Sequence, residues 1–197
     1  MHIPRSLLRV TLALAAAGCT TQHDGPTASP VASGSRSENP AVEVSVSGGG
    51  IIDLSSAGVG DAYFAFNAVR KADGTVYGNF HERRERAGLT IEFVGIVTCV
   101  TVDPVLGRAR IGGVITENRS TDPAFLTANH EVGDDVWFRV QDGGEGSGTS
   151  DGSTVYGFKP TLVNTSLEYC ALPFTGLPWW NPATTFPLRS GNIQIRP

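Results

Sequence analysis

From residue 42 onward, apolar residues alternate with polar ones, and this alternation constrains the fold more than any other feature. The clearest runs are 62–69, 88–93, 135–140 and 191–195. Side chains of a strand point to the same face at every second position, so each run predicts a half-buried strand. The residues expected to face the core are Phe64, Phe66, Ala68, Leu89, Ile91, Phe93, Val136, Phe138, Val140, Ile193 and Ile195.

Short stretches of Gly and Asp separate these runs. Asp73-Gly74, Gly107, Gly112-Gly113 and Gly133-Asp134 are typical of tight turns, and residues 141–153 form a longer glycine-rich connection. Short strands with closely spaced turns are the pattern of an antiparallel sheet. The sequence therefore predicts one all-β domain, either an antiparallel β-sandwich or a flattened β-barrel.

Helix is expected only in minor amounts. Residues 81–88 form one charged stretch that suits either a helix or an exposed strand end, and residues 123–128 suit a single turn. Neither changes the fold class.

The first 18 residues have the features of a secretory signal. Arg5 and Arg9 supply positive charge, the apolar core runs from Leu7 to Ala17, and small residues precede Cys19. A helix over residues 7–18 would rise about 18 Å, well short of the roughly 30 Å hydrocarbon core, so a permanent transmembrane span is not expected.

The end of this run, residues 16–19, reads Ala-Ala-Gly-Cys. It resembles the lipobox of bacterial lipoproteins, which implies cleavage before Cys19 and a diacylglycerol on its sulfur. Ala16 departs from the lipobox, where Leu is usual, and an ordinary cleaved signal with an incidental cysteine is the alternative. Thr20 follows the cysteine in place of an aspartate, which by the same resemblance implies sorting to the outer membrane.

Residues 19–41 follow as a tether that is rich in Thr, Ser, Pro, Gly and Ala. Such a segment cannot bury a core, and as a flexible coil it holds a domain about 25 Å from its anchor. Residues 42–197 are then long enough for one domain. Cleavage removes two arginines and no acid, so the net charge moves from −4 to −6, which argues against nucleic acid as the partner.

Four stretches of the domain carry a family resemblance: residues 64–80, 97–102 with 109–116, 133–146, and the terminal 191–195. They resemble the exported bacterial β modules called post-COAP domains and related lipoproteins of uncharacterised function. This resemblance implies an exported β fold. It transfers no catalytic residue, because the family has none assigned.

Lipidation of Cys19 would leave Cys99 and Cys170 as the remaining pair of cysteines. Disulfides persist in oxidising compartments, so we expect these two to be joined, pinning the proline-rich tail onto the sheet. The alternative is two separate thiols, with Cys99 buried as a small hydrophobe and Cys170 free on a loop.

The glycine-rich connection offers three hard oxygen ligands, Asp142, Glu145 and Asp151, on a flexible backbone. Calcium prefers such ligands, but their spacing does not fit an EF-hand, and Asp and Gly also serve turn geometry. We expect a solvated turn, no metal and no cofactor, and replacement of Asp142 and Asp151 by Asn should then leave stability nearly unchanged.

Trp179 and Trp180 lie among prolines near the C-terminus. Adjacent residues of an extended segment point to opposite sides, so one ring should pack on the domain and the other should be partly exposed. Together they are weak candidates for an aromatic ligand platform, for which core cover is the alternative.

The remaining candidates for catalysis or metal binding each lack the neighbouring residues that their motif requires. Ser150 lies in a G-x-S-x-G match, but no helix pattern follows it, as a nucleophile elbow requires. His81 and His130 each precede a glutamate but lack the second histidine of a zinc-binding helix, and a site joining them across the sheet stays open.

Two functions remain. The first is a lipid-anchored, non-enzymatic module of the cell envelope that binds an envelope protein or a glycan, or that has a structural role. The second is a small secreted hydrolase whose site is assembled from loops. A pocket that joins His81 or His130 to an acid and a hydroxyl would favour the hydrolase.

Overall fold

The structure is a computed structural model, and it describes residues 40–55, 60–145 and 150–197. The predicted signal, Cys19 and nearly all of the tether lie outside these ranges. The first strand begins at Val42, the residue at which the sequence analysis begins the domain.

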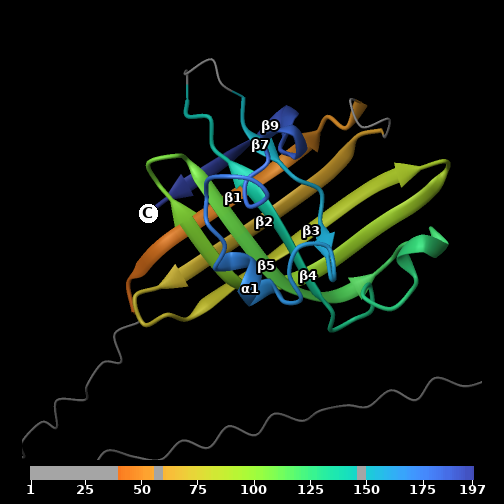
Figure 1. The fold of residues 1–197 in the computed structure, drawn as a ribbon, viewed down its shortest axis with the longest axis horizontal. Coiled ribbons are helices and arrows are strands. Elements are labelled where there is room, and N and C mark those ends of the chain that lie inside the picture. The colour runs from red at the N-terminus through yellow and green to blue at the C-terminus, as the bar shows by residue number, and fades with distance from the viewer. Residues whose placement is uncertain (1–39, 56–59, 146–149) are drawn as a thin grey trace, which may run out of the picture. The chain divides into compact units, whose positions relative to one another are not determined.

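The described residues form nine strands, with very little helix (Figure 1). The elements are β1 (Val42–Ile52), β2 (Ala62–Lys71), β3 (Val76–Arg86), β4 (Leu89–Asp103), β5 (Arg108–Asn118), η2 (Pro123–Phe125), β6 (Asp135–Gln141), β7 (Gly152–Ser153), β8 (Gly157–Phe158), α1 (Ser166–Cys170), η3 (Pro182–Thr184) and β9 (Phe186–Arg196). The predicted all-β class is confirmed. No helix in the described ranges is long and apolar enough to cross a membrane.

The strands belong to one antiparallel sheet of order β5-β4-β3-β2-β1-β9-β7-β6-β8. Strand β5, at one end of this order, also pairs with β6 along residues 108–114. The hydrogen-bonded strands therefore close into a ring, which is the barrel form of the predicted fold.

The predicted alternation produces the interior of this ring, except at Leu89, which is the first residue of β4 and is 39% exposed. On β2, Phe64, Phe66 and Ala68 are all buried, and the residues between them are exposed or half-buried. Aromatic rings from different strands meet inside, with the Phe66 and Phe138 centroids 5.1 Å apart. The interior is a packed apolar core.

One expectation about local structure needs correction, and the structure decides between the two forms expected for the charged stretch. Gly112-Gly113 is not a turn but lies inside β5, where a Cβ on Gly112 would come within 2.7 Å of the Cys99 sulfur and one on Gly113 within 2.1 Å of the Ile96 carbonyl. These glycines permit close packing rather than chain reversal. Residues 81–86 of the charged stretch are strand, and Ala87 and Gly88 then turn the chain with positive φ.

The outer face of β5 and β6 is covered by residues 159–185, which we call the strap. As a result, both faces of β6 are buried, with Val136, Phe138 and Val140 inside the ring and Trp137 and Arg139 beneath the strap. Alternation could not predict this second buried layer, because it marks only one apolar face per strand.

The strap contains α1, an element that the sequence analysis missed. Thr165 caps this helix by accepting the backbone N–H of Glu168 at 3.2 Å. The T-x-x-E spacing of these two residues is a known signal for a helix start. It could have located α1, although the helix is only one turn long.

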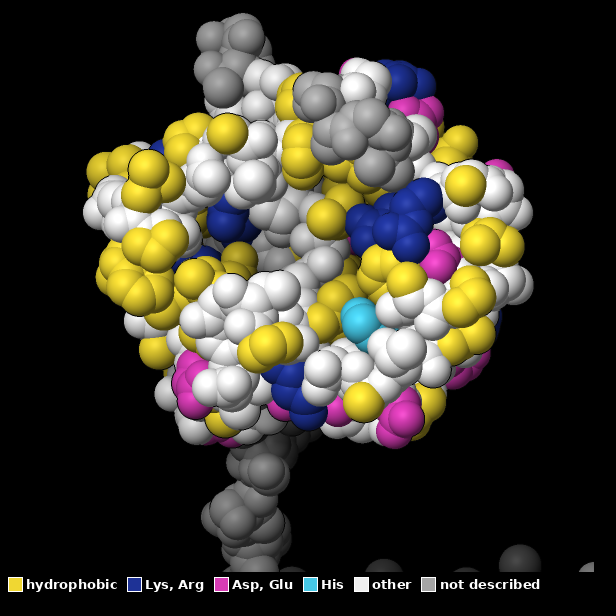
Figure 2. Space-filling model, turned by 45° about the vertical axis from the view of Figure 1, so that its right-hand side comes forward, with side chains coloured by type: hydrophobic (Ala, Val, Ile, Leu, Met, Phe, Trp, Pro, Cys, Tyr) yellow, Lys and Arg dark blue, Asp and Glu magenta, His cyan; other side chains and the backbone are white. Residues whose placement is uncertain are grey.

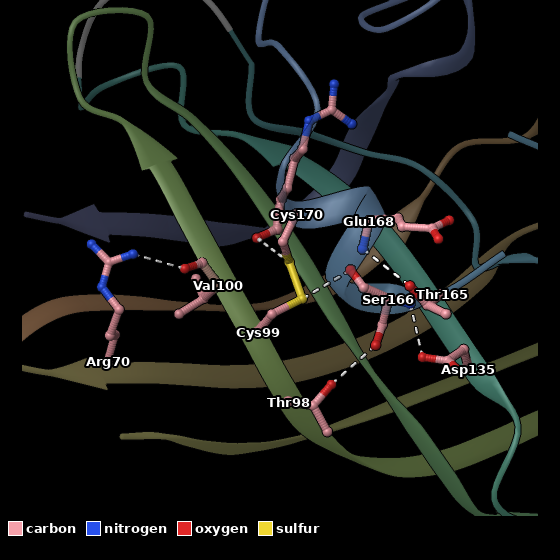
Figure 3. The surroundings of a disulfide bond; sticks show 10 residues. Arg70, Thr98, Cys99, Val100, Asp135, Thr165, Ser166, Glu168 and Cys170 are labelled. Atoms are coloured by element: carbon pink, nitrogen blue, oxygen red, sulfur yellow. Dashed lines mark hydrogen bonds between the residues drawn. A yellow bond between two sulfur atoms is a disulfide. The ribbon is translucent and has the colours of Figure 1, made fainter. Parts of the chain in front are cut away.

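The disulfide expected between Cys99 and Cys170 is confirmed, with Cα atoms 6.3 Å apart. It joins β4 to the end of α1 (Figure 3). Nearby, the Ser166 backbone N–H donates to Asp135 at 2.8 Å, and its hydroxyl lies 3.1 Å from the Thr98 hydroxyl. The bond therefore pins the strap to the sheet at its helical turn.

Candidate functional site

A groove of about 690 Å³ lies at one end of β2 and β3. Its lining residues are Gly60, Asp61, Tyr63, His81, Arg83, Arg84 and Glu85. The lining combines one aromatic ring with hydrogen-bonding groups of both charge signs, which suits a polar, uncharged or weakly charged ligand.

Strand geometry explains why these side chains share one surface. His81, Arg83 and Glu85 alternate along β3, so they point to the outer face of the ring. Tyr63 of β2 lies directly opposite Arg83 in the antiparallel register. The Tyr63 side chain is 56% exposed, so its ring is available to stack against a ligand.

Glu92 of β4 holds two of the basic side chains of the groove, His81 and Arg83. It lies opposite Arg83 in the β3–β4 register. Its carboxylate is 3.1 Å from His81 Nε2 and 3.8 Å from Arg83 Nε, and Arg119 approaches it at 3.4 Å. Glu92 does not line the groove, so its role is to position His81 and Arg83.

Arg84 reaches the groove from the opposite face of the same strand. Its guanidinium is 3.3 Å from the buried Glu82 carboxylate. Burial raises the pKa of Glu82 to about 7, against the opposing effects of Arg84 and of the Tyr156 backbone N–H. Arg84, which lines the groove, is thus paired with a buried acid whose pKa is close to neutral pH.

Comparison of the chain with protein-family models, with curated proteins and with solved structures found no match.

The two candidate histidines have different surroundings. His81 lines the groove, whereas His130 packs among aromatic rings, 4.5 Å from the Phe158 centroid and 5.1 Å from that of Phe125. Burial lowers the pKa of His130. In the described part of the chain, neither histidine is hydrogen-bonded to both an acid and a hydroxyl: His81 contacts Glu92, and His130 contacts the Thr127 hydroxyl.

Ser150 is exposed at the edge of a smaller hollow of about 200 Å³ between β7 and the start of β9. The lining of this hollow contains no histidine. The surroundings of Ser150 therefore do not support a role for it as a nucleophile.

Two of the three candidate calcium ligands bind backbone instead. Asp151 accepts the N–H groups of Gly143 and Ile193 at 2.9 and 2.6 Å. Asp142 accepts those of Gly144 and Ile195 at 2.8 and 3.1 Å. The expectation of a merely solvated turn is wrong, because both carboxylates hold β9 in place.

Glu145, the third candidate, is exposed. Among the residues that the structure describes, no group of three or more His, Cys, Asp or Glu side chains is placed to hold a metal ion.

Of the two tryptophans, one is buried and one is partly exposed, as expected, although the segment forms a turn in which the Trp180 N–H donates to the Gly176 carbonyl at 2.8 Å. Trp180 is 3% exposed on the inner side of the strap and Trp179 is half-buried. Trp180 packs against arginines: its ring centroid lies 4.4 Å from the guanidinium carbon of Arg108, 5.7 Å from that of Arg110 and 5.2 Å from that of Arg139. Its ring is therefore part of a buried cluster rather than an open platform.

The groove residues Tyr63, Arg83 and Asp61 were not singled out by sequence reasoning. A signal was present, because Tyr63 is the large aromatic residue on the polar side of the run 62–69. An exposed ring on a strand also occurs without function, so only the three-dimensional register, which sets Tyr63 beside Arg83, selects it.

Proposed function

We propose that this chain is a lipid-anchored, non-enzymatic binding module of the bacterial cell envelope, and that the β2–β3 groove binds an envelope glycan. The observation that carries the proposal is the groove lining, where the exposed Tyr63 ring adjoins His81, Arg83 and Glu85. A sugar has apolar C–H faces that stack on an aromatic ring and hydroxyls that bind charged, planar groups.

Preorganisation supports binding at this place. Glu92 is only 14% exposed at its side chain and contacts both His81 and Arg83. Side chains that are held before the ligand arrives lose less conformational entropy on binding. A groove lined by restrained side chains is better suited to a small polar ligand than a row of free surface residues.

The predicted N-terminal features support the envelope location. The signal-like residues 1–18, Cys19 and the tether to residue 41 would place the domain about 25 Å from a lipid anchor, within reach of envelope polymers. By the lipobox resemblance, the outer membrane is the proposed site.

The anchor is tested by intact mass. Protein extracted from bacterial membranes should begin at Cys19 and carry the additional mass of a diacylglycerol, and Cys19→Ser should be released from the membrane or remain unprocessed. A wild-type protein that begins at another residue and lacks the lipid mass would contradict the anchor.

Binding is tested with a pair of tyrosine variants. Tyr63→Ala should weaken affinity for soluble peptidoglycan fragments about two- to twelvefold, because loss of one stacking contact costs about 0.5 to 1.5 kcal/mol. Tyr77→Ala is the matched control, since Tyr77 is 44% exposed on β3 and does not line the groove. Isothermal titration calorimetry gives both affinities.

Equal loss in both variants, or no binding by the wild type, would contradict the glycan proposal. Crosslinking of the groove to an envelope protein, in the absence of glycan binding, would also contradict it.

A further inference from the structure

Three arginines beneath the strap share one small region. Arg110 of β5 lies directly opposite Arg139 of β6, and Arg108 precedes Arg110 by two residues, on the same face of β5. Like charges at directly opposed positions of two strands repel each other. Trp180 lies between them and contacts all three guanidinium groups.

No acid neutralises this cluster. The ion pairs among the described residues involve none of these three arginines. Arg110 is 0% exposed and Arg139 is 6% exposed, although the whole chain carries a net negative charge. Buried charges without a partner are costly, so unneutralised arginines at this depth require an explanation.

Strap carbonyl groups satisfy some of the guanidinium N–H groups. Arg110 Nη2 donates to the Pro173 carbonyl at 2.6 Å, and Arg108 donates to that of Phe174 at 2.7 Å. Arg139 donates to the Asn181 carbonyl at 2.7 Å and to the Thr184 hydroxyl at 2.6 Å. These bonds explain how the strap is held, but they supply no negative charge.

Four buried N–H groups of the cluster lack a well-aligned acceptor among the described residues: Arg108 Nε, Arg110 Nε, Arg110 Nη1 and Trp180 Nε1. The Tyr169 side chain is the nearest polar group to the Arg110 guanidinium that could accept from it. Buried donors without acceptors are rare in folded proteins, because an unsatisfied donor loses its hydrogen bonds to water.

Tyr169 does not supply the missing negative charge. Its ring lies 4.8 Å from the Arg110 guanidinium carbon, and its side chain hydrogen-bonds to Arg110 and Arg139. Burial raises the pKa of its phenol, so the group is neutral at neutral pH. The three positive charges therefore face no described group that carries a full negative charge.

We propose that Arg108, Arg110, Arg139 and Trp180 form a binding site for a phosphate-type oxyanion beneath the strap. Such an ion carries both properties that the cluster lacks, namely negative charge and several acceptor oxygens. Figure 2 shows Lys and Arg side chains beside apolar ones on one face of the molecule.

Equilibrium dialysis of the oxidised chain against inorganic phosphate tests this site directly. We expect saturable binding of about one phosphate per chain at matched ionic strength, with a rise in melting temperature of about 3 °C or more at saturation. Phosphate also stabilises proteins generally by exclusion from their surfaces, so the variants described next decide the question.

Trp180→Phe removes one unpaired donor but keeps an aromatic ring for the guanidinium groups, and it should weaken phosphate binding several-fold. Arg108→Gln, at a half-buried position, should weaken it at least tenfold. Arg119→Gln is the control, since Arg119 is 53% exposed and pairs with Glu117, and it should bind like the wild type.

A second arm distinguishes free phosphate from a lipid headgroup. Vesicles of phosphatidylcholine with and without phosphatidic acid are sedimented with the unlipidated Cys19→Ser chain. Binding of inorganic phosphate assigns the free ion, and binding only to vesicles with phosphatidic acid, lost in Arg108→Gln, assigns the headgroup. Absence of both, or equal binding by all variants, would overturn the proposal.

Discussion

Glu82 is an acid in the interior of the ring, with 1% of its surface exposed. One of its oxygens accepts the Tyr156 backbone N–H at 3.1 Å, and the other is 3.3 Å from Arg84 Nη1. Burial is the dominant effect and raises its pKa to about 7 from an ordinary value of 4.5. The folded protein therefore holds this proton more tightly than the unfolded chain does.

This shift makes stability depend on pH. The stabilising effect of the bound proton is complete below pH 4.5, and it is lost as the pH rises to about 7. Relative to Glu82→Gln, the wild type should lose about 3 kcal/mol of unfolding free energy across this window. Urea unfolding at pH 5 and pH 8 measures the difference.

Glu85→Gln is the matched control, because Glu85 is two-thirds exposed on the same strand. It should leave the pH dependence of the wild type unchanged. If Glu82→Gln keeps the same slope as the wild type, Glu82 is not the group that titrates.

At the scale of elements, the junction between β7 and β9 is one of the two shortest in the ring, the other being that between β6 and β7. Only two residue pairs join β7 and β9, Gly152 with Pro187 and Ser153 with Phe186. Farther along β9, the backbone N–H groups of Ile193 and Ile195 donate to Asp151 and Asp142. Two side chains thus take the place of a strand partner and close the ring.

Replacing both aspartates by Asn should therefore destabilise the fold. Each Asn turns one acceptor oxygen into a donor, and loss of two charge-assisted bonds at half-buried positions costs about 3 kcal/mol. Glu145→Gln, an exposed acid in the same connection, should change the unfolding free energy by less than about 0.5 kcal/mol. Chemical denaturation of the three proteins provides the comparison.

A double variant as stable as the wild type would show that these bonds contribute little. A calcium-dependent rise in melting temperature that disappears in the double variant would restore the metal interpretation of the loop.

Sequence patterns predicted the elements whose signals are local in the chain. Alternation located β2, β4, β6 and β9, and Asp73-Gly74 and Gly133-Asp134 marked turns, because period and turn chemistry are local properties. It could not foresee that Gly112 packs against Ser166, since that contact depends on how distant segments meet.

The candidate site was less accessible to sequence reasoning. His81 was singled out, but its neighbours Tyr63 and Glu92 come from other strands and are set beside it by register. The arginine cluster was missed for the same reason: Arg108 and Arg139 are ordinary surface residues by sequence, and they become buried only because the strap covers them.

At the scale of the whole molecule, the strap adds a second buried layer to the ring, and the disulfide holds it there. The bond closes a loop of 71 residues between β4 and α1. In the chain-entropy model, a loop of this length restricts the unfolded chain by about 4 kcal/mol.

Cys99→Ser combined with Cys170→Ser should therefore lower the unfolding free energy by about 4 kcal/mol. Loss of amide protection should be greatest in the strap, because apart from the disulfide it is held by side-chain contacts, such as those from Arg110, Arg139 and Asp135, and not by strand pairing. Hydrogen exchange followed by mass spectrometry locates the change. Uniform loss across all strands would mean that the strap is not a separate unit.

The central claim of this account is that the β2–β3 groove is the ligand-binding surface of an anchored envelope module. Titration of isotope-labelled protein with soluble peptidoglycan fragments, followed by amide chemical shifts, tests it directly. The account predicts saturable shifts centred on Tyr63, His81, Arg83 and Glu85, with Tyr77 unaffected. Shifts confined to another surface, or none at millimolar ligand, would contradict it.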